Sequence, residues 1–179
     1  MKLLIDSIAA KPIQKLYLHD NAFGPIGVAQ FKDFLETTPV LTTLSVSNCG
    51  LGPEATTTIA EALIKNGNVK LEELMISRSR VENVGAHALS RYLGSYDTLQ
   101  HLEIFQNGIR AEGSTALVSS LLPSARSGSL KHLAINDNFF NTDESMEGLC
   151  GLIREASSLE HLNIDSSNIE EEEHIRMLL

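Results

Sequence analysis

The chain has 179 residues, of which 42% are hydrophobic and 21% charged, the composition of an ordinary soluble protein. Its length suits one domain, and its scarce aromatic residues (5%, with no tryptophan) require a core of aliphatic side chains. The formal net charge of −9 argues against binding to nucleic acid or to an anionic membrane, and it favours a partner with a basic surface.

The cysteines and the hydropathy pattern indicate the compartment. Cys49 and Cys150 are the only cysteines, too few for a disulfide framework, which indicates a reducing environment. No apolar stretch approaches the roughly 20 residues that a bilayer requires. The first ten residues do not resemble a signal peptide. We therefore expect a cytoplasmic chain.

An apolar frame, L-x-x-L-x-L with Ile or Val allowed, recurs six times at steps of 28 to 31 residues. Eight residues after each frame start stands a residue that can hydrogen-bond the backbone of a turning loop. The frames start at Ile13, Leu41, Leu71, Leu99, Leu130 and Leu159, and the loop positions are Asn21, Cys49, Ser79, Asn107, Asn138 and Ser167. The pattern is typical of the long class of leucine-rich repeat.

Taken in chain order, residues 1–10 predict the helix of a preceding unit, and each frame then predicts a short strand, a loop and a helix. The helices follow from apolar pairs one turn apart, with a slip of about one residue in the fifth unit. The pairs are Phe31/Leu35, Ile59/Leu63, Leu89/Leu93, Leu117/Leu121 and Leu149/Ile153. The four glutamates at residues 170–173 predict the solvated first turn of a sixth helix or, less favoured, an interaction tail.

The repeats predict an α/β fold, a leucine-rich-repeat solenoid of about six repeats. Its curved parallel sheet would lie inside and its helices outside, because one unit cannot bury its apolar face alone. We expect a single domain over residues 1–179 with a partial repeat at each end. Neither end shows a polar cap, so we expect a piece of a longer solenoid or a truncated relative, whose exposed ends can associate with further copies.

The residues that alternate with the frame leucines are expected to line the concave face. One column contains His101, His132 and His161 on neighbouring strands, roughly 5 Å apart. That spacing could hold Zn²⁺, but no convergent carboxylate or thiol is evident, so solvated histidines are favoured and no metal is expected.

Just past the strands, a polar rim is formed by Asp20, Asn48, Arg78 and Gln106. Neither the rim nor the concave face offers a nucleophile–base–orienter set or a phosphate-binding G-x-x-x-x-G-K loop. A self-contained enzyme is therefore not expected. Protein binding is the default interpretation for the surfaces of such a solenoid.

Five blocks in the rim loops carry strings that leucine-rich repeats in general do not explain. They are residues 18–25 (LHDNAFGP), 48–53 (NCGLGP), 78–83 (RSRVEN), 106–113 (QNGIRAEG) and 136–140 (NDNFF). Repeats in general explain the leucines, but not strings such as R-x-R-x-E-N or Q-N-G-I-R. In these blocks, over about residues 13–145, the sequence resembles the Ran GTPase-activating proteins, and the blocks follow the family's order.

The resemblance implies an activator of GTP hydrolysis on the small GTPase Ran, acting by positioning and charge stabilisation rather than by chemistry of its own. It implies that no arginine finger is used and that Asn48 orients the glutamine with which the GTPase holds the attacking water. Asp20, Arg78 and Gln106, with His19 and Arg80, would be docking contacts. No cofactor is implied, since GTP and Mg²⁺ belong to the GTPase.

Some positions depart from the family or leave alternatives open. The family has more repeats and usually an acidic C-terminal tail, and Ser79 stands where the family has asparagine. Arg80 and Arg110 are equally consistent with a structural role between loops, and Arg78 would be the first candidate if an arginine finger existed. A non-catalytic binding scaffold, like ribonuclease inhibitor or tropomodulin, is the alternative function.

Overall fold

Six short parallel strands form one sheet in chain order, as the repeats predict. The computed structural model describes residues 1–169 and residue 176. Each strand pairs in parallel with the next, and the central leucines of neighbouring frames stand side by side. The strands are β1 (Lys15–Tyr17), β2 (Thr43–Ser45), β3 (Glu73–Met75), β4 (His101–Glu103), β5 (His132–Ala134) and β6 (His161–Asn163).

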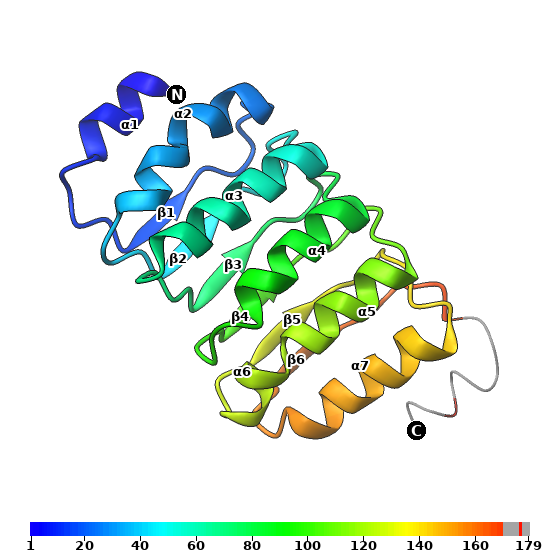
Figure 1. The fold of residues 1–179 in the computed structure, drawn as a ribbon. Coiled ribbons are helices and arrows are strands. Elements are labelled where there is room, and N and C mark those ends of the chain that lie inside the picture. Colours follow the sequence, from blue (N-terminus) through cyan, green and yellow to red (C-terminus); the bar gives the residue numbers. More distant parts are fainter. Residues whose placement is uncertain (170–175, 177–179) are drawn as a thin grey trace.

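The helices form a second layer that covers one face of the sheet, with α1 and α7 at opposite ends of the array (Figure 1). They are α1 (Lys2–Ile8), α2 (Gly24–Thr37), α3 (Gly52–Asn66), α4 (Glu82–Leu93), α5 (Ala111–Ser120), α6 (Leu122–Arg126) and α7 (Asp143–Glu155). The predicted solenoid and its first helix are confirmed. None of the helices within the described residues is long and apolar enough to span a membrane.

The core lies between the two layers and is aliphatic, as the composition predicts. The central frame leucines of the inner strands are completely buried, and each contributes on the order of 1.5–3 kcal/mol by leaving water. They are Leu44, Leu74, Leu102 and Leu133, each 0% exposed. Leu162 on the last strand is only half-buried, because no described strand follows β6.

The concave face is less open than the alternation of residues predicts. Thr43 and Ser45 on β2 are buried, although both were expected to face solvent. Lys15 and Glu73 stand on either side of Thr43 in the register, and their side chains form an ion pair of 3.2 Å that joins β1 to β3 across it. A small side chain between long neighbours is therefore shielded from water.

A buried hydrogen-bonding ladder joins the loops, as the Asn/Cys/Ser column predicts. Asn107 is the clearest rung: its Nδ2 donates to Ile76 O of the preceding repeat at 2.9 Å, and its Oδ1 accepts from Ser79 N at 2.8 Å. In the second repeat the Cys49 thiol donates to Leu18 O at 3.0 Å. These bonds satisfy backbone groups that would otherwise be buried without partners.

The long fourth step of the frame is absorbed on the helical side. There α5 ends at Ser120, and a separate short helix, α6, begins with Pro123 in its first turn. Proline suits that position because its missing N–H has no partner in a first turn. The glutamates at residues 170–173, expected to begin a sixth helix or to form a tail, lie outside the described residues.

Candidate protein-binding rim

In every repeat the third residue after the end of the strand adopts the left-handed conformation, with φ between 51° and 60°. We call these residues the rim: Asp20, Asn48, Arg78, Gln106, Asp137 and Ser166. Their N–H groups continue the ladder between repeats, as in Asn48 N to Ser77 O at 2.9 Å. This conformation is uncommon outside glycine, but every repeat shares it, so it belongs to the repeat turn and marks no particular rim residue as functional.

At the second repeat, the rim carries an ordered pair of side chains. Asn48 is exposed because Cys49 takes the buried ladder position. Asn48 Nδ2 donates to Asp20 Oδ1 at 2.8 Å, and only the NH₂ group of the amide can donate to a carboxylate. Asp20 therefore determines which way the amide faces. Within the described part of the chain, no donor reaches Asn48 Oδ1, which remains available as an acceptor.

His19 lies next to this pair, at the border between the rim and the concave face. Its Nδ1 is 3.3 Å from Ser45 Oγ, and its ring meets Tyr17 edge to face at 6.4 Å. Tyr17 is half exposed. The structure thus brings His19, Asp20 and Asn48 together as one group, with an aromatic side chain beside it.

Two of the three remaining predicted contacts lie together over the third and fourth repeats, and Arg78 does not join them. Arg80 and Gln106 line a cavity of about 650 Å³. Arg78 is an exposed rim residue and lies outside the set of residues that line the cavity. Among the described ion pairs none involves Arg78, Arg80 or Arg110, on a chain with net charge −9.

The cavity contains residues that the sequence did not assign to a site. Arg110 lines it together with Phe139, which is 37% exposed. The sequence left Arg110 open between a structural and a docking role, and the structure shows that its backbone N–H is held by Asn83 Oδ1 at 2.8 Å while its side chain reaches the cavity. The sequence signal for Phe139 was a second phenylalanine directly before Phe140, which is buried in the core.

One loop of this group departs from its neighbours in the backbone. Arg80 and Glu82 both have φ of 53°, whereas Gly50 and Gly52 stand at the equivalent positions of the second repeat. A left-handed residue with a side chain costs about 1–2 kcal/mol. The third repeat therefore carries strain that the second repeat avoids.

On the concave face, the histidines stack more closely than strand spacing alone requires. The rings of His101 and His132 are 3.8 Å apart and those of His132 and His161 4.1 Å, all nearly parallel. Burial, and then the neighbouring imidazoles, hold the pKa of His132 below its ordinary value. The expectation that no carboxylate converges here was wrong: Glu103 shares a face of β4 with His101, two residues away, and approaches its Nε2 to 3.0 Å.

A family model described as the leucine-rich repeat matches residues 98–118. The C-terminal domain of tropomodulin from Caenorhabditis elegans superposes with a TM-score of 0.66 at 16% identity, over 84% of this chain and 88% of that domain. At this identity the likeness concerns the fold alone.

Two sequence relatives are Ran GTPase-activating proteins. The Ran GTPase-activating protein 2 of Caenorhabditis elegans is 36% identical over 107 residues, which are 54% of this chain and 11% of the relative. The Ran GTPase-activating protein 1 of Saccharomyces cerevisiae is 29% identical over 174 residues, 92% of this chain and 42% of the relative. The chain therefore spans about a tenth and about two fifths of the lengths of these relatives.

Proposed function

We propose that this chain stimulates GTP hydrolysis by a small GTPase of the Ran type. It is a leucine-rich-repeat solenoid related to the Ran GTPase-activating proteins. The observation that carries the proposal is the pair formed by Asn48 and Asp20. It presents an oriented amide acceptor at the edge of a surface that a partner can reach.

The proposed chemistry is positioning. Asn48 Oδ1 accepts a hydrogen bond from the side-chain amide of the partner's catalytic glutamine, whose other groups then hold the attacking water. Asp20 supports this arrangement because it engages the amide donor of Asn48 and so prevents the side chain from turning. Orientation of this kind matters because a misplacement of 1 Å can cost about 10²-fold in rate. GTP and Mg²⁺ are supplied by the GTPase, so the chain needs no cofactor.

Charge supports docking around this pair. The net charge of −9 attracts a basic partner surface from a distance, whereas Arg78, Arg80 and Arg110 offer cations at short range. We propose that these arginines meet acidic groups of the GTPase, with Gln106 and His19 as polar neighbours. The proposal includes a cytoplasmic location.

The alternative function is a non-catalytic binding scaffold. It is compatible with the shared fold of the tropomodulin domain, since the same solenoid surfaces serve protein binding in general. A scaffold would use the rim for affinity alone, and it would not require a particular orientation of the Asn48 amide.

Single-turnover GTP hydrolysis by Ran, with the full chain in excess, tests the proposal. We expect the wild-type chain to stimulate hydrolysis and Asn48→Ala to lose about 10²-fold of the stimulation. Asp137→Ala is the matched control, because Asp137 has the same rim conformation three repeats away and should leave the rate unchanged.

Variants at Asp20 test whether the orientation of the Asn48 amide, and not merely its contact with the partner, affects the rate. Asp20→Ala removes the acceptor for Asn48 Nδ2 and should lower the maximal rate, whereas Asp20→Asn retains an acceptor oxygen and should recover most of it. If the wild-type chain binds Ran without stimulating hydrolysis, the scaffold function is correct. If stimulation survives Asn48→Ala, the activator function stands but the role of Asn48 is wrong.

A further inference from the structure

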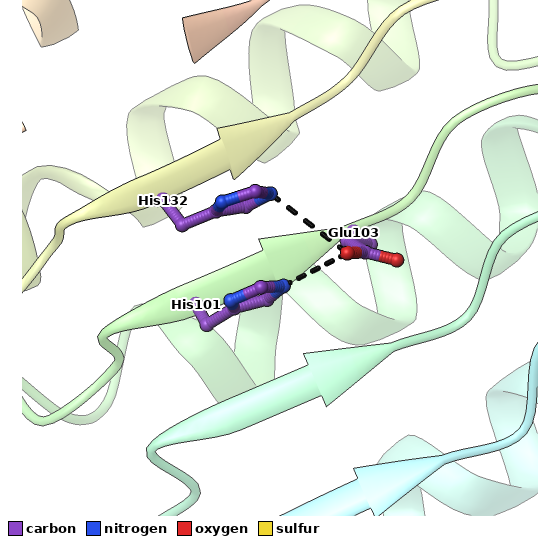
Figure 2. A group of neighbouring side chains, drawn as sticks. All are labelled: His101, Glu103 and His132. Carbon is purple, nitrogen blue, oxygen red and sulfur yellow. Dashed lines mark hydrogen bonds and ion pairs between the residues drawn. The ribbon is translucent and has the colours of Figure 1, made fainter. Parts of the chain in front are cut away.

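Two histidines and a glutamate converge on neighbouring strands of the sheet (Figure 2). His101 and Glu103 lie on β4, and His132 lies on β5. Each side chain offers one ligand atom, and these atoms lie within 4.8 Å of one another. Both Nε2 atoms face the same carboxylate oxygen, Glu103 Oε1, at 3.0 Å from His101 and 3.8 Å from His132.

We propose that His101, Glu103 and His132 form a binding site for a divalent first-row transition-metal ion, and that this ion is Zn²⁺. Two imidazole nitrogens and one carboxylate oxygen are a donor set that zinc uses, with a fourth position left open to solvent. Imidazole also favours such ions over Mg²⁺ and Ca²⁺, which prefer oxygen ligands.

The donor atoms need only a local movement to reach coordination distances. In the stack, the planes of His101 and His132 are 3° from parallel, so their in-plane lone pairs point in nearly the same direction and cannot both meet one ion. The rings must rotate apart to give two Zn–N distances of about 2.0–2.1 Å. Their side chains are 30% and 26% exposed, and that of Glu103 32%, so core packing does not hold them.

The surroundings favour a cation at this place. The chain has a net charge of −9, and a bound divalent ion would offset part of it. Coordination requires the lone pairs of neutral imidazoles, and both Nε2 atoms already face the carboxylate oxygen that would complete the donor set. His161, the third ring of the stack, is exposed and lies outside the ligand set.

Zinc titration of the metal-free full chain by calorimetry, with Co²⁺ absorption as a report on the ligands, tests the site. We expect one equivalent to bind, and we expect His132→Ala and Glu103→Gln each to weaken binding at least about tenfold, since even groups behind the ligands contribute that much. His87→Ala is the matched control: His87 also pairs with a glutamate, Nε2 to Glu112 Oε1 at 3.3 Å, but without a second imidazole.

The circular dichroism of each variant shows whether the solenoid is folded, and His132→Gln provides a variant that keeps a polar side chain of similar size. The proposal is wrong if the wild-type chain binds Zn²⁺ no more tightly than His132→Ala does. It is also wrong if replacing His101 leaves Zn²⁺ binding intact while His161→Ala or His174→Ala abolishes it. His174 lies outside the described residues. This test does not use Ran, so its outcome is independent of the activator function.

Discussion

Replacing Arg80 with glycine should stabilise the solenoid. Arg80 has φ of 53°, and the equivalent positions of the two adjacent repeats are Gly50 and Gly108. Its side chain is exposed and forms no ion pair within the described part of the chain, so truncation removes little packing. The backbone therefore dominates the expected effect.

The magnitude follows from two opposing effects. Relief of the left-handed conformation contributes about 1–2 kcal/mol, while the greater freedom of glycine in the unfolded chain costs about 0.4–1 kcal/mol. We expect Arg80→Gly to raise the free energy of unfolding by roughly 0.5–1 kcal/mol from these two values. For a chain of this size that corresponds to a rise of about 1–4 °C in Tm.

Urea unfolding followed by circular dichroism measures the difference, because a change in midpoint at constant slope reports a change in stability. Arg110→Gly is the matched control: Arg110 is also an exposed arginine of a rim loop, but its φ of −92° is relaxed, so glycine there should bring no gain. If Arg80→Gly were no more stable than the wild-type chain, strain in this loop would not be the reason for its unusual backbone.

The same variant connects stability with function. Strained residues persist where the surrounding structure or a function requires them, and a docking role would explain why arginine stands where the adjacent repeats have glycine. We expect Arg80→Gly to be more stable and yet a weaker activator in the Ran assay. A variant that gains stability and keeps full activity would remove Arg80 from the docking surface.

Two further predictions concern the helices and the histidines. A Cβ at Gly113 would lie 2.7 Å from Asn83 Oδ1, so Gly113→Ala should lower the free energy of unfolding, measured in urea, by about 1–3 kcal/mol. A Cβ at Gly151 in α7 would meet no atom within 4 Å, so Gly151→Ala should raise the free energy of unfolding by about 0.4–1 kcal/mol. The pKa of His132 is lowered from 6.5, so the unfolded chain binds this proton first and stability should fall as pH drops below about 6.5 towards the lower folded pKa. His132→Asn should remove that part of the pH dependence, and an unchanged dependence would contradict the assignment.

The features that repeat were predictable from the sequence, because the backbone alone determines them. A leucine frame of constant length requires the strands to pair in register. The ladder residue follows at a constant offset, so Asn107 and Cys49 could be placed before their hydrogen bonds were known. Gly113 follows its frame start by fourteen residues, as Gly27 and Gly85 follow theirs, and in the structure it lies at the start of α5 against Asn83 of α4.

Features that depend on side-chain direction or on a single departure from the repeat were not predictable. Glu103 was assigned to the concave face, but its approach to His101 depends on a rotamer that spacing does not determine. The left-handed conformation of Arg80 and Glu82 contradicts the preference of both residues, so local sequence argued against it. The cavity beside them depends on where two arginine side chains lie, and no periodic pattern describes that.

The rim shows where specificity can reside in such a fold. All six rim residues share one backbone conformation, so the backbone cannot distinguish the second repeat from the fifth, and any functional difference must come from the side chains. The pair at the second repeat requires an acid at Asp20 and an amide at Asn48, 28 residues apart. Because the turn is the same at Asp137, a difference between Asn48→Ala and Asp137→Ala would measure the chemistry of the side chain and not the integrity of the turn.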